Sequence, residues 1–263
     1  MLKNITLSKS SSPRGVVVPF TRALGLLAAF TPDEKWLGNG DLVMRTNLPA
    51  STVSRIVQTL VKLGYLAHDA ENRKYCLTSL VLTLGYGATA NSEVQQVAYA
   101  YMQSFAERHK LCVNLSSRDR LDMIVLESYQ SVDSMLAFNL SVGVRLSIAS
   151  SPTGWALLAA LPELERYYLL ENIERRMSRD WPRLRRRALE GLSQVSRVGF
   201  CTSLGEWGSE ISTVAAPLLG NNHAPLVLTC IGSSQMMTRA RVEREIGPQL
   251  LAMISSIQQR VSP

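Results

Sequence analysis

The sequence has few of the residues that metal binding and disulfide formation require. It contains three histidines and four cysteines in 263 residues. The cysteines form no CxxC pair, and none stands at ligand spacing from a histidine; they are Cys76, Cys112, Cys201 and Cys230. This pattern argues against a zinc site and a disulfide framework, and it is typical of a reducing compartment.

Recognisable catalytic motifs are also missing. The sequence contains no HExxH, no GxSxG elbow, no P-loop and no GxGxxG stretch. A nucleophilic Cys201 or Cys230 has no identifiable partner residue, so buried structural thiols are the better interpretation. We therefore predict no catalytic residues, no metal, no cofactor and no enzymatic activity.

Long apolar runs are absent as well. No run approaches the roughly 18 residues that cross a bilayer, and the first 20 residues contain no apolar signal-peptide core. With 46% apolar and 19% charged residues, the chain is folded and long enough for two domains. We expect a cytoplasmic protein without membrane partners.

Basic charge is concentrated near the N-terminus. The net charge is +7, and residues 1–85 contain ten Lys or Arg against five Asp or Glu. A locally basic domain is the expected footprint of a polyanion binder. The first residues, "MLKNITLSKSSSPRG", predict a flexible basic arm, which either contacts phosphate or is simply a disordered terminus.

The segment after this arm predicts a winged helix-turn-helix. A short apolar helix covers residues 20–30, and a second helix within 38–47 is capped by Asp41 and ended by Asn47. A third helix covers 49–64, and two short strands surround a polar turn at 69–72. Three helices followed by a hairpin are the elements of that motif.

The third helix, "PASTVSRIVQTLVKLGYL", has two distinct faces. Its apolar stripe comprises Val53, Ile56, Val57, Leu60 and Leu63. The opposite face is polar and basic and contains Ser51, Arg55, Gln58 and Lys62, flanked by Ser54 and Thr59. No acidic residue occurs from 49 to 66, although exposed helices usually mix charges of both signs. This face is either a solvated surface or a reader of nucleic acid.

The chemistry of these residues suits DNA. Arg55 can bind guanine through two hydrogen bonds, and Gln58 can pair with adenine. Lys62, together with Arg73 and Lys74 on the hairpin, is placed to contact phosphates. Surface decoration is the alternative for the hairpin residues.

The remaining chain predicts an α+β domain with a largely antiparallel sheet. Strands are expected at 111–117, 121–128, 134–140, 210–219 and 224–232, with "GNNH" as the last turn, and helices at 154–161, 163–197 and 239–260. The arginine-rich run 171–190 also contains acidic residues, so a solvated or intersubunit face is favoured over a second nucleic-acid surface.

Four blocks resemble the IclR-type bacterial transcriptional regulators: "FTRALGLLAAF", "LPASTVSRIVQTLVKLGYLAHDAENRKYCLT", "SPTGWALLAALPE" and "EISTVAAPLLGNNHAPLVLTCIG". The resemblance covers about residues 20–260. It implies an α/β (α+β) protein with a winged helix-turn-helix at 20–85 after an arm at 1–19, a linker helix at 86–110, and a GAF-like ligand-sensing domain at 111–263. It also implies a homodimer or homotetramer on a double-stranded DNA operator, and a small-molecule effector, typically a carboxylate or aromatic acid.

The resemblance assigns site residues by position. Those implied for DNA are Ser51, Thr52, Ser54, Arg55, Gln58, Lys62, Arg73 and Lys74. Those implied for the effector are Ser151, Pro152, Thr153, Gly154, Ser203, Thr213, Cys230 and Gly232. The chain departs from the family pattern at Trp155, Ser203 and Glu210, which leaves open a different effector or a degenerate pocket.

Two alternatives remain at this point. The "SSPTGW" loop either binds a carboxylate at the start of a helix or only caps that helix. The whole chain is either a ligand-responsive DNA-binding regulator or a small-molecule-binding protein or enzyme whose helix-turn-helix serves protein contacts only.

Overall fold

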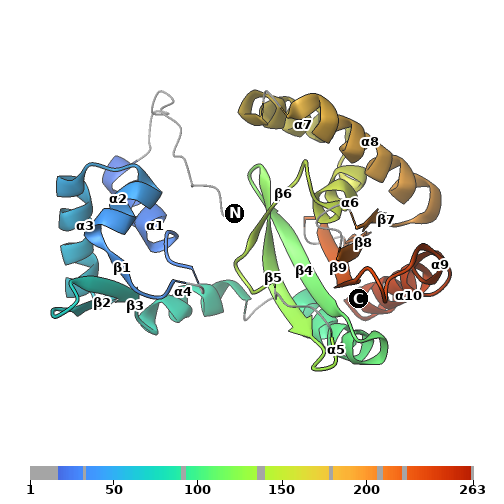
Figure 1. Cartoon of the computed structure of the whole chain (residues 1–263), viewed down its shortest axis with the longest axis horizontal. Helices are drawn as coiled ribbons and strands as arrows, with labels where there is room; N and C mark the ends of the chain where they lie inside the picture. The colour runs from blue at the N-terminus through green and yellow to red at the C-terminus, as the bar shows by residue number, and fades with distance from the viewer. Residues whose placement is uncertain are drawn as a thin grey trace. The chain divides into compact units, whose positions relative to one another are not determined.

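The computed structural model describes residues 17–31, 34–89, 93–134, 140–177, 180–205, 210–220 and 224–261. The chain divides into two compact units, residues 1–91 and 92–263 (Figure 1). Most of the predicted arm lies outside the described residues. Its last two positions belong to the first helix, which begins at Val18 because Pro19 suits the first turn of a helix.

The first unit is the predicted winged helix-turn-helix. Its elements are α1 (Val18–Leu27), β1 (Leu37–Gly38), α2 (Asn39–Thr46), α3 (Ala50–Lys62), β2 (Leu66–Asp69), β3 (Lys74–Leu77) and α4 (Leu80–Thr89). The three strands form an antiparallel sheet in the order β1-β3-β2. The β2–β3 hairpin is the predicted wing, and β1 is an extra strand that the sequence pattern did not indicate.

Local chemistry fixes the ends of α2 and α3. Asp41 accepts a hydrogen bond from the Gly38 amide at 2.9 Å, so it caps α2 from the third helical position rather than from the one before the helix. Asn47 ends α2 with φ 54°, and Gly64 follows α3 with φ 80°, both in the left-handed region.

One side of α3 forms the core of this unit. Val53 and Val57 are fully buried, and Leu60 is nearly so. They pack with Leu26 of α1 and Leu42 of α2. Leu63 is 59% exposed, so including it in the apolar stripe was wrong: the helix ends at Lys62, and the chain turns away at Gly64.

The second unit contains a six-stranded sheet in which every pairing is antiparallel, in the order β6-β5-β4-β9-β8-β7. Its strands are β4 (Cys112–Asp119), β5 (Asp122–Gln130), β6 (Arg145–Ser147), β7 (Cys201–Leu204), β8 (Ile211–Leu218) and β9 (Leu226–Ser233). Its helices are α5 (Glu93–His109), α6 (Pro152–Ala160), α7 (Glu163–Met177), α8 (Trp181–Val198), α9 (Arg239–Arg241) and α10 (Gly247–Val261).

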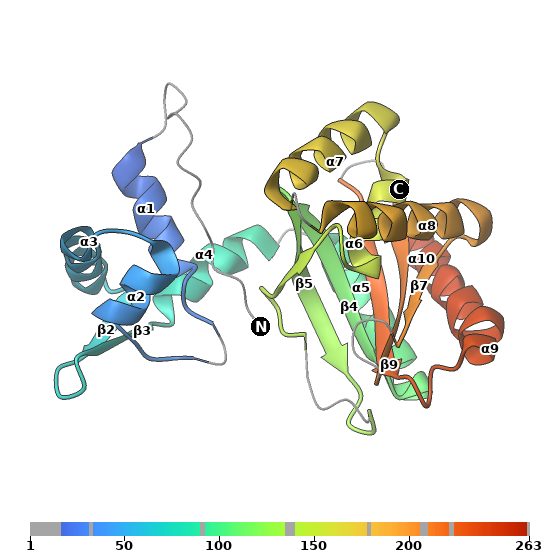
Figure 2. The same ribbon diagram turned by 45° about the horizontal axis from the view of Figure 1, so that its top comes forward.

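Helices cover both faces of this sheet. Helices α6, α7 and α8 lie on one side, and α5 and α10 lie on the other (Figure 2). Because side chains alternate along a strand, β9 contributes Leu228 and Cys230 to the core under α5 and α10, and Val227 and Ile231 to the core under α6. We refer to the side of the sheet that α6 covers as the α6 face.

Some of the expected elements differ from those in the structure, and others lie partly outside the described residues. The region 86–110, expected as one linker helix, contains the end of α4 and all of α5, and residues 90–92 between them lie outside the described residues. Residues 135–139 of the strand expected at 134–140, and residues 221–223 of the "GNNH" turn, also lie outside the described residues. The helical run 163–197 is two helices, because Pro182 starts α8. Strands β6 and β7 were not expected, since both are too short for a clear alternation.

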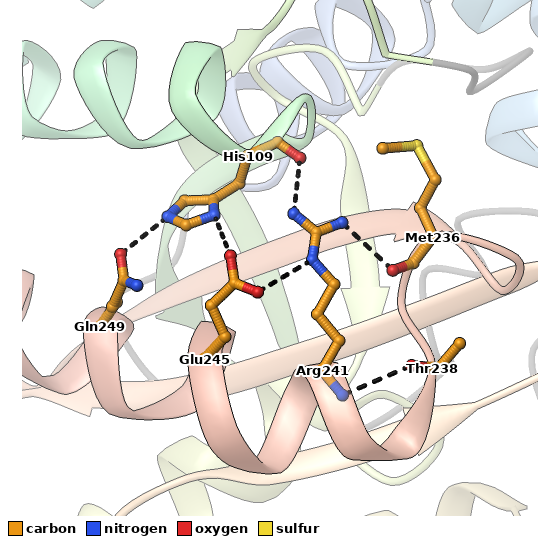
Figure 3. Close-up of polar contacts among 6 residues, drawn as sticks. All are labelled: His109, Met236, Thr238, Arg241, Glu245 and Gln249. Atoms are coloured by element: carbon orange, nitrogen blue, oxygen red, sulfur yellow. Dashed lines mark hydrogen bonds and ion pairs between the residues drawn. The ribbon is translucent and has the colours of Figure 1, made fainter.

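The last helix is not regular. A π-helical turn, Val242–Ile246, joins α9 to α10. Within it, Glu245 lies 3.2 Å from Nδ1 of His109, and Gln249, one turn later, lies 2.9 Å from Nε2 (Figure 3). Arg241 donates to Glu245 at 3.3 Å and to the Met236 carbonyl at 3.2 Å, so this cluster fastens the end of α5 to the C-terminal helices.

Acidification should destabilise the second unit through His109. The ring is 3% exposed, and burial holds its pKa below the ordinary value near 6.5, although Gln249 and Glu245 oppose the shift. The unfolded chain therefore binds a proton between pH 6.5 and the lowered pKa while the folded chain does not. The contribution of the neutral His109 ring to the free energy of unfolding is fully present above pH 6.5. It is lost as the pH drops through that window, by at most about 1.4 kcal/mol per pH unit.

Urea unfolding of the wild type and of His109→Gln from pH 7.5 to 5.5 measures this contribution. The wild type should lose more stability on acidification than the variant. The matched control is His68→Gln in the other unit, which makes the same substitution without touching the contacts of His109. Equal losses in the wild type and His109→Gln would contradict the assignment.

Candidate nucleic-acid interface and ligand site

The polar face of α3 is exposed and chemically available. Ser51, Arg55, Gln58 and Lys62 are all exposed. Within the described part of the chain, neither Arg55 nor Lys62 forms an ion pair or a side-chain hydrogen bond with another residue. A cationic face without internal partners retains its full capacity to bind phosphates and base edges.

Two smaller residues of α3 are less free. Ser54 is half-buried, and its hydroxyl accepts a hydrogen bond from Asn39 Nδ2 at 3.2 Å, which ties α3 to the start of α2. Thr52 is also half-buried. Both are less accessible than Ser51, Arg55 and Gln58, which are exposed and can reach a bound duplex more directly.

The hairpin holds its basic residues on a rigid turn. Asp69 accepts from the amides of Glu71 and Asn72 at 3.0 and 3.1 Å, and from Asn72 Nδ2 at 2.7 Å. The hydrogen bonds from Asn72, its side chain first, lower the pKa of the Asp69 carboxyl. Arg73 follows at φ 52°, and both it and Lys74 are exposed.

Several other arginines form ion pairs within the chain. Arg45 is paired with Glu34 and donates to the Ala29 carbonyl at 2.9 Å, which joins α2 to the segment after α1. In the arginine-rich run, Arg176 lies 3.0 Å from Asp122 and Arg187 lies 3.5 Å from Glu190. This pairing agrees with a solvated face on α7 and α8 and distinguishes Arg176 and Arg187 from Arg55 of α3.

The loop "SSPTGW" satisfies its own helix end. The Ser151 hydroxyl accepts from the Gly154 amide at 3.1 Å and donates to the Ser147 carbonyl at 2.7 Å. The Ser151 carbonyl accepts from the Trp155 amide. Because both amides are occupied, the geometry favours the capping alternative over a carboxylate site at this helix start.

The structure brings together six of the eight effector residues. Thr153 and Thr229 share a hydrogen bond of 3.0 Å between their hydroxyls, which places the start of α6 directly over β9. Ser203 and Thr213 are paired across β7 and β8, and alternation puts both on the α6 face with Cys201 and Ala215. Ser151, Pro152 and Gly154 complete the group on the α6 side.

Cys230 and Gly232 do not join that group. Cys230 packs in the core under α5 and α10, and a side chain at Gly232 would meet Leu111 and Met237 of the same core. The β9 side chains on the α6 face are instead Thr229 and Ile231. Sequence reasoning missed Thr229 by one position, although it is the polar residue within the apolar stretch "LVLTCIG".

The buried thiols are poor nucleophiles. Burial raises the pKa of both the Cys201 and Cys230 thiols far above the ordinary range. Cys201 donates to the Pro152 carbonyl at 3.3 Å, so it also has a structural role beside α6. Among the described residues, no group of three or more His, Cys, Asp or Glu side chains is placed to hold a metal ion.

None of the helices in the described residues combines the length and the apolar character that a bilayer crossing requires.

An exposed cationic helix in a winged helix-turn-helix, joined to a second α/β unit, defines a DNA-binding transcriptional regulator with a separate ligand-responsive domain. Residues 20–70 match the family model of the IclR helix-turn-helix domain, and residues 86–262 match that of the bacterial transcriptional regulator IclR C-terminal domain. The chain belongs to the IclR family.

Known proteins are similar over nearly the whole chain. The HTH-type transcriptional regulator TsaQ1/TsaQ2 of Comamonas testosteroni is 31% identical over 250 residues, which are 94% of this chain and 89% of the relative. A crystal structure of an IclR family transcriptional regulator from Brucella abortus is 38% identical, with a TM-score of 0.81 and 94% of each chain covered. These relatives are named as regulators, not as enzymes.

A third similarity concerns the fold. An IclR homolog from Microbacterium hydrocarbonoxydans, crystallised with 4-hydroxybenzoate, has a TM-score of 0.70 and 23% identity, with 92% of this chain and 99% of that chain covered. Together with the family match, these similarities confirm the expected α/β architecture.

Replacement of Gly154 should disturb the α6 face. A Cβ atom at this position would lie 2.2 Å from the Ile148 carbonyl oxygen, so Gly154→Ala forces backbone atoms apart and should cost about 1–3 kcal/mol of unfolding free energy. The matched control is Gly40→Ala in α2, where nothing lies within 4 Å of the added atom. In chemical denaturation, the free energy of unfolding of Gly40→Ala should stay unchanged or rise by up to about 1 kcal/mol. Equal losses of stability in Gly154→Ala and Gly40→Ala would contradict the close packing at Gly154.

Proposed function

We propose that the chain binds a specific DNA operator through α3 and the β2–β3 hairpin, as a homodimer or homotetramer, and that a small organic molecule on the α6 face modulates this binding. The carrying observation is the polar face of α3, which is exposed, free of acidic residues and without internal partners. Arg55 and Gln58 read bases, and Lys62, Arg73 and Lys74 position the unit on phosphates.

The family supports the oligomeric and ligand-sensing parts of this proposal. A dimer presents two copies of α3 to successive major grooves, which requires a pseudo-palindromic operator. The 4-hydroxybenzoate complex of the Microbacterium homolog supports a small aromatic or organic acid as one candidate class of effector. Effector binding shifts the population between states with different operator affinity.

Removal of the Arg55 guanidinium should weaken operator binding and relax specificity. Arg55→Ala removes a contact worth about 1–3 kcal/mol at one base pair, so the specific Kd should rise about 5- to 150-fold while non-specific affinity changes less. Fluorescence anisotropy with operator and scrambled duplexes measures both. The matched control is Arg185→Ala in α8, which removes the same charge from an exposed arginine that has no ion pair among the described residues. Unchanged affinity in Arg55→Ala would remove Arg55 from the interface.

Removal of the Lys62 ammonium should act without regard to sequence. Lys62→Ala loses one phosphate contact, so the slope of log K against log salt should become shallower by about 0.9, equally for operator and scrambled DNA. Titration at four salt concentrations gives this slope. If the wild type shows no salt-dependent affinity for any duplex, the helix-turn-helix serves protein contacts instead.

A further inference from the structure

A side-chain hydrogen bond joins the two helices of the helix-turn-helix. Asn39, the first residue of α2, donates from Nδ2 to the Ser54 hydroxyl of α3 at 3.2 Å. Within the described residues, no other side-chain hydrogen bond connects α2 with α3, and the core that they share is apolar. Because Asn39 is exposed, water competes for this bond, and the bond contributes little to the free energy of unfolding.

Ser54 lies at the edge of the polar face of α3. On a helix, residues three and four apart are neighbours, so Ser54 adjoins both Ser51 and Gln58. Ser51 and Gln58 are exposed, whereas Ser54 is half-buried beside Asn39. The amide of Asn39 therefore continues the polar face of α3 onto the start of α2.

The start of α2 also adjoins the basic end of the hairpin. Gly38, directly before Asn39, is paired with Lys74 across β1 and β3. A Cβ atom at Gly38 would lie 3.8 Å from the Arg73 carbonyl oxygen. Arg73 and Lys74 are both exposed. Asn39 thus lies between the two surfaces of the proposed DNA interface, the polar face of α3 and the basic hairpin.

The surroundings of Asn39 are open to a nucleic-acid backbone. Asn39 and Gly40 are both exposed, and nothing lies within 4 Å of the position that a Gly40 Cβ would take. The acidic side chain nearest in sequence, Asp41, is half-buried and accepts from the Gly38 amide at 2.9 Å. The backbone of the helix start therefore engages this carboxylate.

The amide of Asn39 retains a donor for a phosphate. An asparagine side chain has two N–H groups and one carbonyl oxygen, and Ser54 occupies one of the N–H groups. In helix-turn-helix complexes, the first helix crosses the sugar-phosphate backbone while the second enters the major groove. Asparagine is among the neutral residues that donate to phosphate oxygens, and such contacts fix the register of a protein on DNA.

We propose that Asn39 contacts a DNA phosphate and that Ser54 positions it for this contact. One N–H of Asn39 is held by the Ser54 hydroxyl, and the other donates to a phosphate beside the major groove that α3 enters. The Asn39–Ser54 bond then fixes α3 relative to that phosphate. The proposal rests on the proposed function and adds a contact residue outside α3 and the hairpin.

Affinity and salt dependence separate this contact from those of Arg55 and Lys62. Asn39→Ala should raise the operator Kd about 3- to 10-fold, the loss of one neutral hydrogen bond. The slope of log K against log salt should stay that of the wild type, because no cation is removed. The ranking of operators with single base-pair changes should also persist, since Asn39 contacts no base. An unchanged Kd, a shallower slope or a changed ranking overturns the proposal.

Ethylation of individual operator phosphates tests the contact directly. Among the phosphates at which ethylation weakens binding of the wild type, one in each half-site should become insensitive in Asn39→Ala, while the others stay sensitive. A general loosening of the helix packing would not remove the sensitivity of a single phosphate. If Asn39→Ala retains every sensitive phosphate of the wild type, or loses several at once, Asn39 is not a phosphate contact.

A double-mutant cycle tests the role of Ser54. Ser54→Ala alone should weaken operator binding, because the Asn39 amide is no longer held. The double variant Asn39→Ala/Ser54→Ala should bind like Asn39→Ala, since Ser54 acts through Asn39. Additive losses would show that Ser54 affects binding independently of Asn39 and would refute its positioning role.

An asparagine in the other unit is the matched control. Asn172 Nδ2 donates to the Tyr168 carbonyl at 2.7 Å, so Asn172→Ala also removes one side-chain hydrogen bond and should leave the operator Kd unchanged. The unfolding temperature of Asn39→Ala should stay close to that of the wild type; a large fall would assign Asn39 a structural role instead. If the wild type shows no salt-dependent affinity for duplex DNA, the proposed function fails, whereas wild-type affinity in Asn39→Ala contradicts only the role of Asn39.

Discussion

Burial of both faces of the six-stranded sheet is the constraint on which the second unit depends. Every central strand contributes alternate residues to two cores, so a shift by one position moves a side chain to the opposite side of the protein. This is why Thr229 contacts α6 while its neighbour Cys230 packs under α5 and α10. The same constraint decides which polar residues lie on the same face of the sheet.

The two units use polar residues in different ways. On α3 the side chains of Arg55 and Lys62 face solvent and have no ion-pair partner among the described residues, which leaves them available for the proposed DNA contacts. On the α6 face polar groups are buried, and most are paired, as Thr153 is with Thr229 and Ser151 with Gly154. Among the described residues, four buried side-chain atoms stand out because they have no hydrogen-bond partner: Asn114 Nδ2, Ser116 Oγ, Trp181 Nε1 and Thr213 Oγ1.

The C-terminal helices add a rigid attachment for α5. The π-helical turn changes the helical phase, and Glu245 and Gln249 reach both ring nitrogens of His109. Such turns are rare and occur mostly as single turns within α-helices. Here Arg241 bridges Glu245 and the Met236 carbonyl, so the end of α5 is held by a network of three side chains.

The sequence by itself determined the winged helix-turn-helix, the caps at Asn47 and Gly64, and the polar face of α3, because these depend on short-range periodicity and turn chemistry. It also indicated the antiparallel character of the second unit. Only the tertiary structure decided which face of β9 lies under α6, the position of the short strands β6 and β7, and the placement of Thr153 against Thr229. Those features depend on pairing between strands distant in sequence, and a local pattern does not contain the register of such a pairing.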